Sequence, residues 1–283
     1  MTRIITGAVG ILFMIPACIY SHTFIWPLLL SFFSFIAVNE ILSGTGFAKE
    51  ERAHSNVARI FSLLPLYTYF LSIRSDLMDK YRALFLLSAL FFFVQLVVAL
   101  FHENRLHSDK LYGTVAMVLY VVVSLTAISY IRHIDYGNEE GKYIYLLVFF
   151  GGWVSDTFAY FTGMLFGKKK LCPAISPKKT IEGSIGGVLA NMIVFAGYAL
   201  VLRSFFDVGA NIAFFAILGA LFSAVGQIGD LIASSIKRHY NIKDFGRFFP
   251  GHGGVLDRFD STLATAIVML MLDAAFGAAF LIR

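Results

Sequence analysis

The stretch FPGHGGVLDRFDS, residues 249–261, gathers residue types that could do chemistry with metal ions and phosphates. Asp257 and Asp260 are three positions apart, so both carboxylates can lie on one face of a helix. Proteins usually hold Mg²⁺ with one or two carboxylates, and water and phosphate oxygens complete its coordination. Gly253 and Gly254 precede these acids, and bare backbone of this kind lets an anion approach the N–H groups closely. The stretch therefore indicates a site for a divalent cation and a phosphate-bearing ligand.

Basic side chains accompany these acids throughout the loop 237–260. Carboxylates for a hard cation, interleaved with bases for phosphate oxygens, are typical of phosphoryl or nucleotidyl transfer. His252 has two interpretations, because it can contact a phosphate or simply pack within the loop. The candidate phosphate-binding bases of this loop are Lys237, Arg238, Lys243, Arg247 and Arg258.

A second basic loop, residues 167–182, carries five lysines. Ser176 followed by Pro177 predicts a helix N-cap with proline at the first helical position. Lys178 and Lys179 would then lie in the first helical turn, where the helix dipole disfavours cations, so their presence indicates an anionic ligand. The alternative is a basic cluster beside the membrane that sets topology and contacts acidic lipid headgroups.

Two acids lie deep within apolar runs of the sequence, where an ionised carboxylate usually faces a partner or a water-filled cavity. Asp156 is about half-way along its run, and Asp230 is within two turns of the next basic loop. Ser234 and Lys237 follow Asp230 on the same helical face. The alternative for both acids is a protonated carboxyl group in a helix–helix hydrogen bond. Glu40, near the end of an earlier run, is interpreted as an interfacial or packing acid without an assigned role.

The elements that must position these residues are predicted to be membrane-spanning helices. Apolar residues make up 58% of the 283, charged residues 14%, and the mean hydropathy is +0.75. Soluble domains carry about 25% charged residues, and a helix needs about 20 apolar residues to cross the hydrocarbon core. The sequence predicts an all-α, polytopic integral membrane protein with about nine spans, at 4–20, 24–42, 57–73, 83–101, 112–131, 143–166, 183–202, 209–236 and 261–282.

Basic residues predict how these spans are oriented. Alternate connections carry 15 Lys and Arg on one side and 8 on the other. Because cytoplasmic loops are enriched in basic residues, both basic loops are expected in the cytoplasm. The net charge of +5 follows from this bias and gives no reason to expect nucleic acid as a partner.

The two cysteines do not indicate a disulfide framework, and the run 4–20 is expected to be a retained span and not a cleaved signal. Residues 1–142 are predicted to be structural or dimerisation helices. Residues 143–283 are predicted to be the catalytic region, because they contain both basic loops and both intramembrane acids.

The segment SSIKRHYNIKDFGRFFPGHGGVLDRFD resembles the signature of the phosphatidate cytidylyltransferase (CDP-diacylglycerol synthase) family. A second segment, SDTFAYFTGMLFGKKKLCPAISPKKTIEG, is similar to an upstream family motif at Asp156, Ala159, Tyr160 and 176–183. Chance agreement over so many positions is negligible. The resemblance covers 150–283, and the earlier spans match only in hydrophobicity. The signature positions matched are Ser234, Ile236, Lys237, Arg238, Lys243, Asp244, Gly246, Phe249, Pro250, His252, Gly253, Gly254, Val255, Asp257, Arg258, Phe259 and Asp260.

The resemblance implies a reaction of CTP with phosphatidate that gives CDP-diacylglycerol and pyrophosphate, with Mg²⁺, in the inner or plasma membrane. It implies an all-α membrane fold, a homodimer, and a polar cavity that opens to the cytoplasm and laterally to membrane lipids. The lipid phosphate would attack the α-phosphorus of CTP in line. A monovalent cation such as K⁺ beside Mg²⁺ is suggested by the resemblance alone.

The resemblance also implies roles for individual residues. Asp230 and Asp257 would be the Mg²⁺ ligands, and they would act in catalysis together with Asp156, Lys237 and Arg258. The expected substrate-binding residues are Ser176, Lys178, Lys179, Ser234, Arg238, Lys243, Asp244, His252, Gly253, Gly254 and Asp260.

Two other functions are consistent with part of the pattern. A related enzyme with another lipid acceptor, such as an isoprenoid-type phosphate, would share the motifs. A lipid or ion transporter would share only the intramembrane acids, and it would explain neither the dense basic loops nor the lack of an internal repeat.

Overall fold

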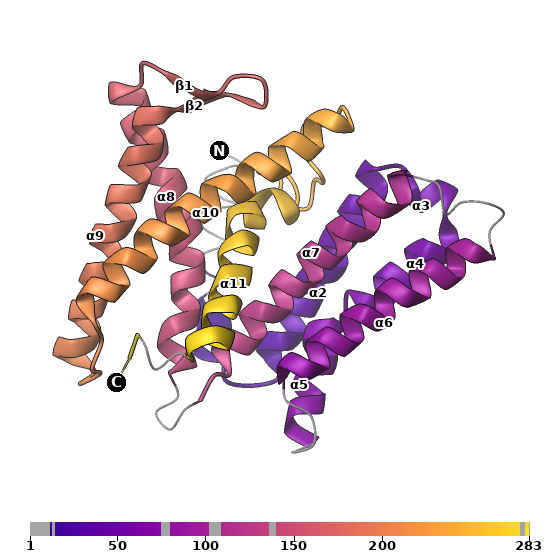
Figure 1. Ribbon diagram of the computed structural model, residues 1–283, viewed down its shortest axis with the longest axis horizontal. Coiled ribbons are helices and arrows are strands. Elements are labelled where there is room, and N and C mark those ends of the chain that lie inside the picture. The colour runs from indigo at the N-terminus through magenta and orange to yellow at the C-terminus, as the bar shows by residue number, and fades with distance from the viewer. Residues whose placement is uncertain are drawn as a thin grey trace. The chain divides into compact units, whose positions relative to one another are not determined.

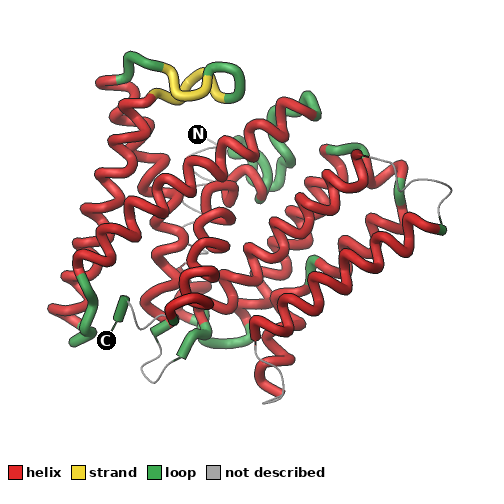
Figure 2. Tube along the Cα trace, viewed as in Figure 1, coloured by secondary structure: helices red, strands yellow, loops and turns green. Residues whose placement is uncertain are grey.

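The computed structural model describes residues 12, 15–74, 80–101, 109–135, 140–277 and 281–282, and every structural statement below concerns these residues. Most of them are helical, and a short two-stranded hairpin connects α8 to α9 (Figures 1 and 2). The helices are α2 (Ile25–Gly44), α3 (Phe47–Glu50), α4 (Arg52–Phe61), α5 (Leu64–Arg74), α6 (Lys80–Leu100), α7 (Asp109–Arg132), α8 (Gly141–Phe166), α9 (Ile181–Phe205), α10 (Ile212–His239) and α11 (Leu256–Phe276); the strands are β1 (Lys170–Cys172) and β2 (Ser176–Thr180).

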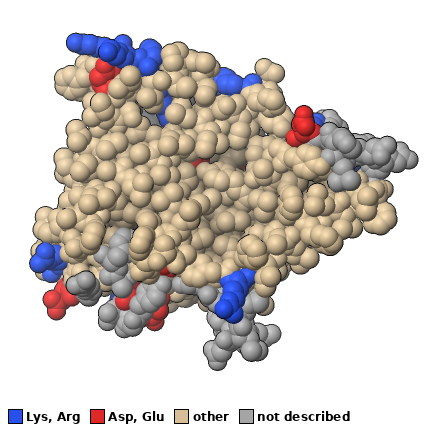
Figure 3. Space-filling view, in the orientation of Figure 1, with Lys and Arg blue, Asp and Glu red and all other residues tan. Residues whose placement is uncertain are grey.

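Seven of the described helices are long and apolar enough to cross a membrane: α2, α6, α7, α8, α9, α10 and α11. They confirm the prediction of an all-α polytopic membrane protein. Large apolar side chains on the surfaces of these helices are exposed, as expected of a surface that contacts lipid. Phe93 on α6 is 61% exposed and Ile193 on α9 is 72% exposed. In α9 the charged residues are Glu182 and Arg203, one near each end, and much of the face in Figure 3 has neither basic nor acidic side chains.

Two of the nine predicted spans are not among these seven. The run 4–20 lies largely outside the described residues. The run 57–73 is divided between α4, which ends at Phe61, and α5, which begins at Leu64, so the structure does not confirm one continuous helical span there. Pro65 explains the division, because it has no N–H to donate to the carbonyl of Phe61 and its ring would clash with that turn. Neither helix has the roughly 20 residues that a span needs.

The chain divides into two compact units, which are described separately. Unit 1 contains Met1–Tyr130 and Tyr240–Arg258, and unit 2 contains Ile131–His239 and Phe259–Arg283. Most of the 237–260 loop is therefore grouped with the N-terminal helices, although it lies far from them in the sequence. The functional division at residue 142 stays a prediction.

Unit 1 is held together by apolar packing and a few buried polar contacts. The rings of Phe61 on α4 and Phe91 on α6 stack with centroids 4.1 Å apart. Ser31 on α2 accepts a hydrogen bond from the backbone N–H of Leu66 at 3.0 Å, which fixes the start of α5. The largest fully buried side chains of α2 are Trp26, Leu30, Ile41 and Leu42.

Unit 2 has α8, α9 and α10 packed closely through small residues. A methyl group at Gly187 on α9 would lie 2.9 Å from the carbonyl oxygen of Ser155 on α8, and one at Gly183 would also meet α8. Gly183 and Gly187, which are four positions apart, therefore form a small-residue packing face against α8. Asn191, which is fully buried on α9, donates to the carbonyl of Gly151 on α8 at 2.8 Å. The backbones of α8 and α9 are therefore close enough for side chain-to-backbone hydrogen bonds.

The hairpin between α8 and α9 corrects one prediction about the first basic loop. β1 and β2 pair antiparallel, with Cys172 opposite Ser176. The N-cap of α9 is Thr180, whose Oγ1 accepts from the backbone N–H of Gly183 at 3.1 Å. Ser176 is therefore not an N-cap, and Lys178 and Lys179 lie in β2 and not in a helical turn. Pairing with β1 keeps the segment extended, and Thr180, the last residue of β2 and opposite Lys170, is the one whose side chain caps the helix.

Glu182 stabilises the base of this hairpin from the first turn of α9. Its carboxylate accepts from the backbone N–H of Lys168 at 3.0 Å and of Lys169 at 3.2 Å. A carboxylate near a helix N-terminus is also favoured by the helix dipole. The base of the hairpin, where β2 leads into α9, is thus anchored by Thr180 and Glu182.

Candidate functional site

In unit 1, the segment 240–255 folds into a loop beside a cavity of about 620 Å³. The backbone N–H of His252 donates to the carbonyl of Phe249 at 2.9 Å, and that of Phe249 donates to the carbonyl of Gly253 at 2.9 Å. Gly251 and Gly253 have φ angles of 78° and 86°, which favour glycine. These bonds and angles make a tight reversal that brings the two arms of the loop together.

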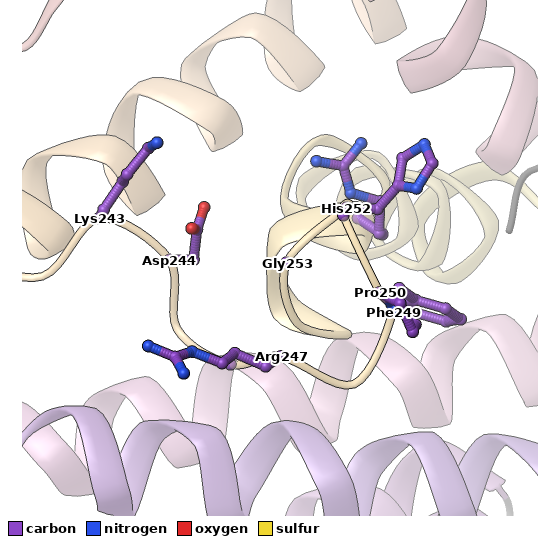
Figure 4. Close-up of a pocket in the computed structure, with 10 residues that line it drawn as sticks. Lys243, Asp244, Arg247, Phe249, Pro250, His252 and Gly253 are labelled. Carbon is purple, nitrogen blue, oxygen red and sulfur yellow. The ribbon is translucent and has the colours of Figure 1, made fainter. Parts of the chain in front are cut away.

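Basic side chains dominate the lining of this cavity. Lys243, Arg247 and Arg258 are exposed, with Asp244 as the acid among them. Lys243, Asp244 and Arg247 lie along one arm of the loop and His252 lies on the other (Figure 4). His252 is half-buried, and its Nδ1 has no hydrogen-bond partner among the described residues. The cavity thus gathers predicted phosphate-binding residues, and its excess of positive charge suits a phosphate-bearing ligand.

Asp257 ties both arms of this loop to the first turn of α11. Its Oδ2 accepts from the backbone N–H of Phe245 at 2.8 Å and from that of Gly254 at 3.0 Å. The residue is 8% exposed. Asp257 therefore has a structural role, which sequence reasoning did not predict, in addition to the metal-binding role expected for it.

Glu40 on α2 also bonds this loop, and sequence reasoning left it without a role. Its Oε1 accepts from the backbone N–H of Val255 at 2.9 Å, and its Oε2 accepts from that of Leu256 at 3.0 Å. The carboxylate thus caps the N-terminus of α11. A separation of 215 residues hid this contact, and the only local signal was a single acid near the end of an apolar run.

In unit 2, Asp156 and Asp230 line a second cavity of about 340 Å³. Asp230 on α10 forms an ion pair with Lys179 of β2. Lys179 also donates from Nζ to the backbone carbonyl of Gln227 at 3.4 Å, and Lys178 lines the same cavity. The structure therefore brings together four predicted site residues from α8, α10 and the hairpin.

Asp260, on the part of α11 that belongs to unit 2, adds a third acid to this region. It is 9% exposed and interacts electrostatically with Asp230, Asp156 and Lys237. Ser261 donates from Oγ to Oδ2 of Asp156 at 3.2 Å, which connects α11 to α8. Like charges repel strongly in a medium of low dielectric constant, so this group of acids favours a cation beside it.

The remaining predicted residues of unit 2 lie around the hairpin and the end of α10. Ser234 donates from Oγ to Oδ1 of Asp230 at 3.5 Å, which is a long hydrogen bond. Arg238 donates from Nε to the carbonyl of Ile175, in the connection between β1 and β2, at 3.4 Å. Ser176 is half-buried in β2. The end of α10 and the hairpin are therefore in contact.

The donor set of unit 2 fits Mg²⁺, although the predicted ligand pair of Asp230 and Asp257 spans the two units and stays a prediction. Among the described residues, no group of three or more His, Cys, Asp or Glu side chains is arranged to hold a metal ion. Mg²⁺ needs only one or two carboxylates, because phosphates and water supply its other oxygens. The three acids of unit 2 supply hard oxygen donors of this kind, and Lys178, Lys179 and Lys237 lie beside them.

Comparison with known proteins places this arrangement among cytidylyltransferases. The model of the Cytidylyltransferase family matches residues 1–276. The chain is similar to a protein of Staphylococcus epidermidis named phosphatidate cytidylyltransferase, with 45% identity over 139 residues, which cover 49% of this chain and 52% of that protein.

Two further relatives have the same name. The protein of Staphylococcus haemolyticus is 47% identical over 124 residues, and that of Staphylococcus aureus is 47% identical over 124 residues. Each alignment covers 44% of this chain and 46% of the relative. The chain thus spans about half the length of the curated relatives it matches.

Proposed function

Because the chain belongs to the Cytidylyltransferase family, we propose that it is a phosphatidate cytidylyltransferase, which converts CTP and phosphatidate to CDP-diacylglycerol and pyrophosphate. The relatives that bear this name support the substrate assignment. The observation that carries the proposal is the cavity of unit 2, where acids of membrane-length helices meet the lysines of a hairpin. A lipid phosphate and a soluble nucleotide can react only where a membrane protein offers such a polar cavity.

In the proposed reaction, an oxygen of the phosphatidate phosphate attacks the α-phosphorus of CTP in line. The new P–O bond forms as the bond from the α-phosphorus to the bridging oxygen of the β-phosphate breaks, and pyrophosphate leaves with that electron pair. The attacking oxygen is already anionic, because a phosphate monoester is ionised at neutral pH. The protein therefore contributes mainly positioning and stabilisation of charge.

The basic residues of both units would bind the phosphates. Lys178 and Lys179 lie on a strand that is paired with β1 and anchored at the base of the hairpin, so their side chains are presented on a fixed backbone. A phosphate that binds Lys179 would replace Asp230 as its partner, and the freed carboxylate would then be open to a cation. Charge-assisted hydrogen bonds of this kind are roughly twice as strong as neutral ones. The other phosphate-binding residues would be Lys237, Arg238, Lys243, His252 and Arg258.

Asp230 and Asp257 would hold Mg²⁺, which when bound neutralises charge that develops on the transferred phosphate. Asp156 lines the cavity beside Asp230 and would orient water or substrate there. K⁺ as a second cation, a homodimer and a cytoplasmic active site complete the proposal.

The activity can be tested with the purified chain in lipid nanodiscs. Labelled CTP is offered with a panel of acceptors that includes phosphatidate and an isoprenoid phosphate, and the liponucleotide products are separated. We expect CDP-diacylglycerol from phosphatidate, with one pyrophosphate released per product. A product from the isoprenoid phosphate alone would identify a different lipid acceptor, and no product from any acceptor would overturn the proposal.

The orientation can be tested by single cysteines at Lys169 and Lys243, one in each basic loop, in a chain without its two native cysteines. Both positions are exposed in the structure. We expect both to be protected from a membrane-impermeant reagent in sealed cells and labelled after permeabilisation. Labelling of either position from outside would reverse the orientation.

A further inference from the structure

Glu40 is buried beside the loop 240–255, and its carboxylate bonds the start of α11. The side chain comes from α2, is 7% exposed, and accepts the backbone N–H groups of Val255 and Leu256. These N–H groups belong to the residue before α11 and to its first residue, and N–H groups at this end of a helix have no partner within it. A carboxylate at this position satisfies both donors and complements the helix dipole.

Two glycines of the loop show that its backbone closes around this carboxylate. A methyl group built at Gly246 or at Gly254 would overlap the carboxyl group of Glu40. Neither residue is among the described glycines with positive φ, so backbone conformation does not require glycine at either position. Glycine is required at both positions because a larger side chain would occupy the space of the Glu40 carboxylate. One glycine lies on each arm of the loop, so the carboxylate lies where the arms converge.

The same region contains the residues that line the cavity of unit 1. Lys243 and Arg247 lie on the arm that includes Gly246, and Arg258 lies in the first turn of α11, two positions after Leu256. Asp257, which belongs to that turn, bonds the backbone of both arms of the loop. Glu40 bonds this turn to α2, which is long enough to span a membrane. The bond therefore helps to fix the positions of the three basic side chains.

We propose that Glu40 is a positioning residue: its carboxylate holds the loop 240–255 and the first turn of α11 in the conformation that presents Lys243, Arg247 and Arg258 to substrate phosphates. The part of this inference that concerns substrate rests on the proposed function. The part that concerns the loop is independent of it. Glu40 itself lies outside the lining of the cavity and does not contact the reacting atoms in this role.

The first experiment compares Glu40→Gln and Glu40→Ala with the wild type in nanodiscs. Ser34→Ala is the matched control, because Ser34 is fully buried on the same helix and its hydroxyl has no hydrogen-bond partner among the described residues. We expect kcat/KM for CTP to fall by about ten-fold in the Gln variant, which keeps one acceptor oxygen, and by about 100-fold in the Ala variant, as for a misplaced reactive group. Ser34→Ala is expected to match the wild type.

Hydrogen–deuterium exchange supplies a measurement that does not depend on activity. The amides of Val255 and Leu256 are expected to exchange at least about ten-fold faster in Glu40→Ala, because each loses its acceptor, while amides in α8 and α9 keep their protection. Uniformly faster exchange would show a general structural role and would overturn the inference. So would wild-type exchange at both amides, or full activity in Glu40→Ala. An inactive wild type would count against the proposed function, and exchange at these amides would still decide the role of Glu40.

A double variant tests whether the glycine and the acid act as one unit. Gly246→Ala alone is expected to lower kcat/KM by about 100-fold, because its methyl group displaces the carboxylate. Combined with Glu40→Ala, which makes room for the methyl group, it should cause no further loss. Contacting residues that act together are non-additive in this way. Losses that multiply in the double variant would show that the two residues act separately.

Discussion

The acids of the two units have the same functional group and different partners. In unit 1, Glu40 and Asp257 bond backbone N–H groups of the loop and of the start of α11. In unit 2, Asp156 and Asp230 bond side chains, a serine hydroxyl and a lysine ammonium respectively. Backbone donors fix a conformation, whereas a side-chain cation can move away when a ligand arrives. The comparison separates acids that build the site from acids that remain open to ligands.

Asp230→Asn gives the largest expected loss of activity with little loss of stability. The substitution removes the charge that pairs with Lys179 and that would bind Mg²⁺, and no backbone N–H bonded by this side chain is left without a partner. We expect formation of CDP-diacylglycerol to fall by at least about 10³-fold, with a melting temperature close to that of the wild type. Product formation is measured across a Mg²⁺ titration. Strong activity in this variant, or in wild-type protein with EDTA, would remove Asp230 from the chemistry.

Asp257→Ala should show the opposite balance, with a large loss of stability. Two buried N–H groups lose their acceptor, and each such group costs about 1–3 kcal/mol. We expect the free energy of unfolding to fall by about 2–4 kcal/mol, measured by denaturation in detergent. Asp257→Asn keeps an acceptor oxygen and should retain most of the stability while it loses activity. Equal stability of the Ala variant and the wild type would contradict the comparison of the two units.

Lys178→Met combined with Lys179→Met tests whether the hairpin lysines bind phosphate. Each charge-assisted bond contributes about 1.5–3 kcal/mol, so KM for CTP or phosphatidate should rise about ten-fold or more. Lys168→Met is the control, because this exposed lysine is in the same basic loop and does not line the cavity. If the double variant and the control have the same KM at physiological salt, the lysines serve topology alone.

Thr180→Ala should give the smallest effect. It removes the N-cap of α9 and is expected to cost about 1 kcal/mol of stability, whereas Ser176→Ala should stay within about 0.5 kcal/mol of the wild type. Thermal unfolding of both variants measures the difference. If Ser176→Ala lost as much stability as Thr180→Ala, Ser176 would be the N-cap, as the sequence predicted.

Features determined by local composition could be predicted from the sequence. Seven membrane-length helices were predictable because an apolar run of about 20 residues is itself the physical requirement for a span. The division of the run 57–73 had a visible signal in Pro65, but hydropathy averages over a single proline. The start of α9 had two candidates, Ser176 and Thr180, and strand pairing with β1, which hydropathy does not reveal, decides between them.

The candidate site was predictable in its residue types and less so in its contacts. The sequence predicted that Asp156, Asp230 and the hairpin lysines belong to the same site, and in the structure they line one cavity. It could not predict which backbone groups the acids of unit 1 bond, because these contacts depend on how distant segments fold together. Gly246 and Gly254 show the limit, since their reason for being glycine is a side chain more than 200 residues earlier in the chain.

The long separation between Glu40 and Val255 also has a consequence for biosynthesis. At roughly 5–20 residues per second, the ribosome makes Val255 roughly 10–40 s after Glu40, because 215 residues lie between them. During that interval α2 can enter the membrane, but its carboxylate has neither of its final donors. Unit 1 is therefore completed only after Leu256 has been translated, and a chain truncated before residue 255 leaves the carboxylate of Glu40 without either donor.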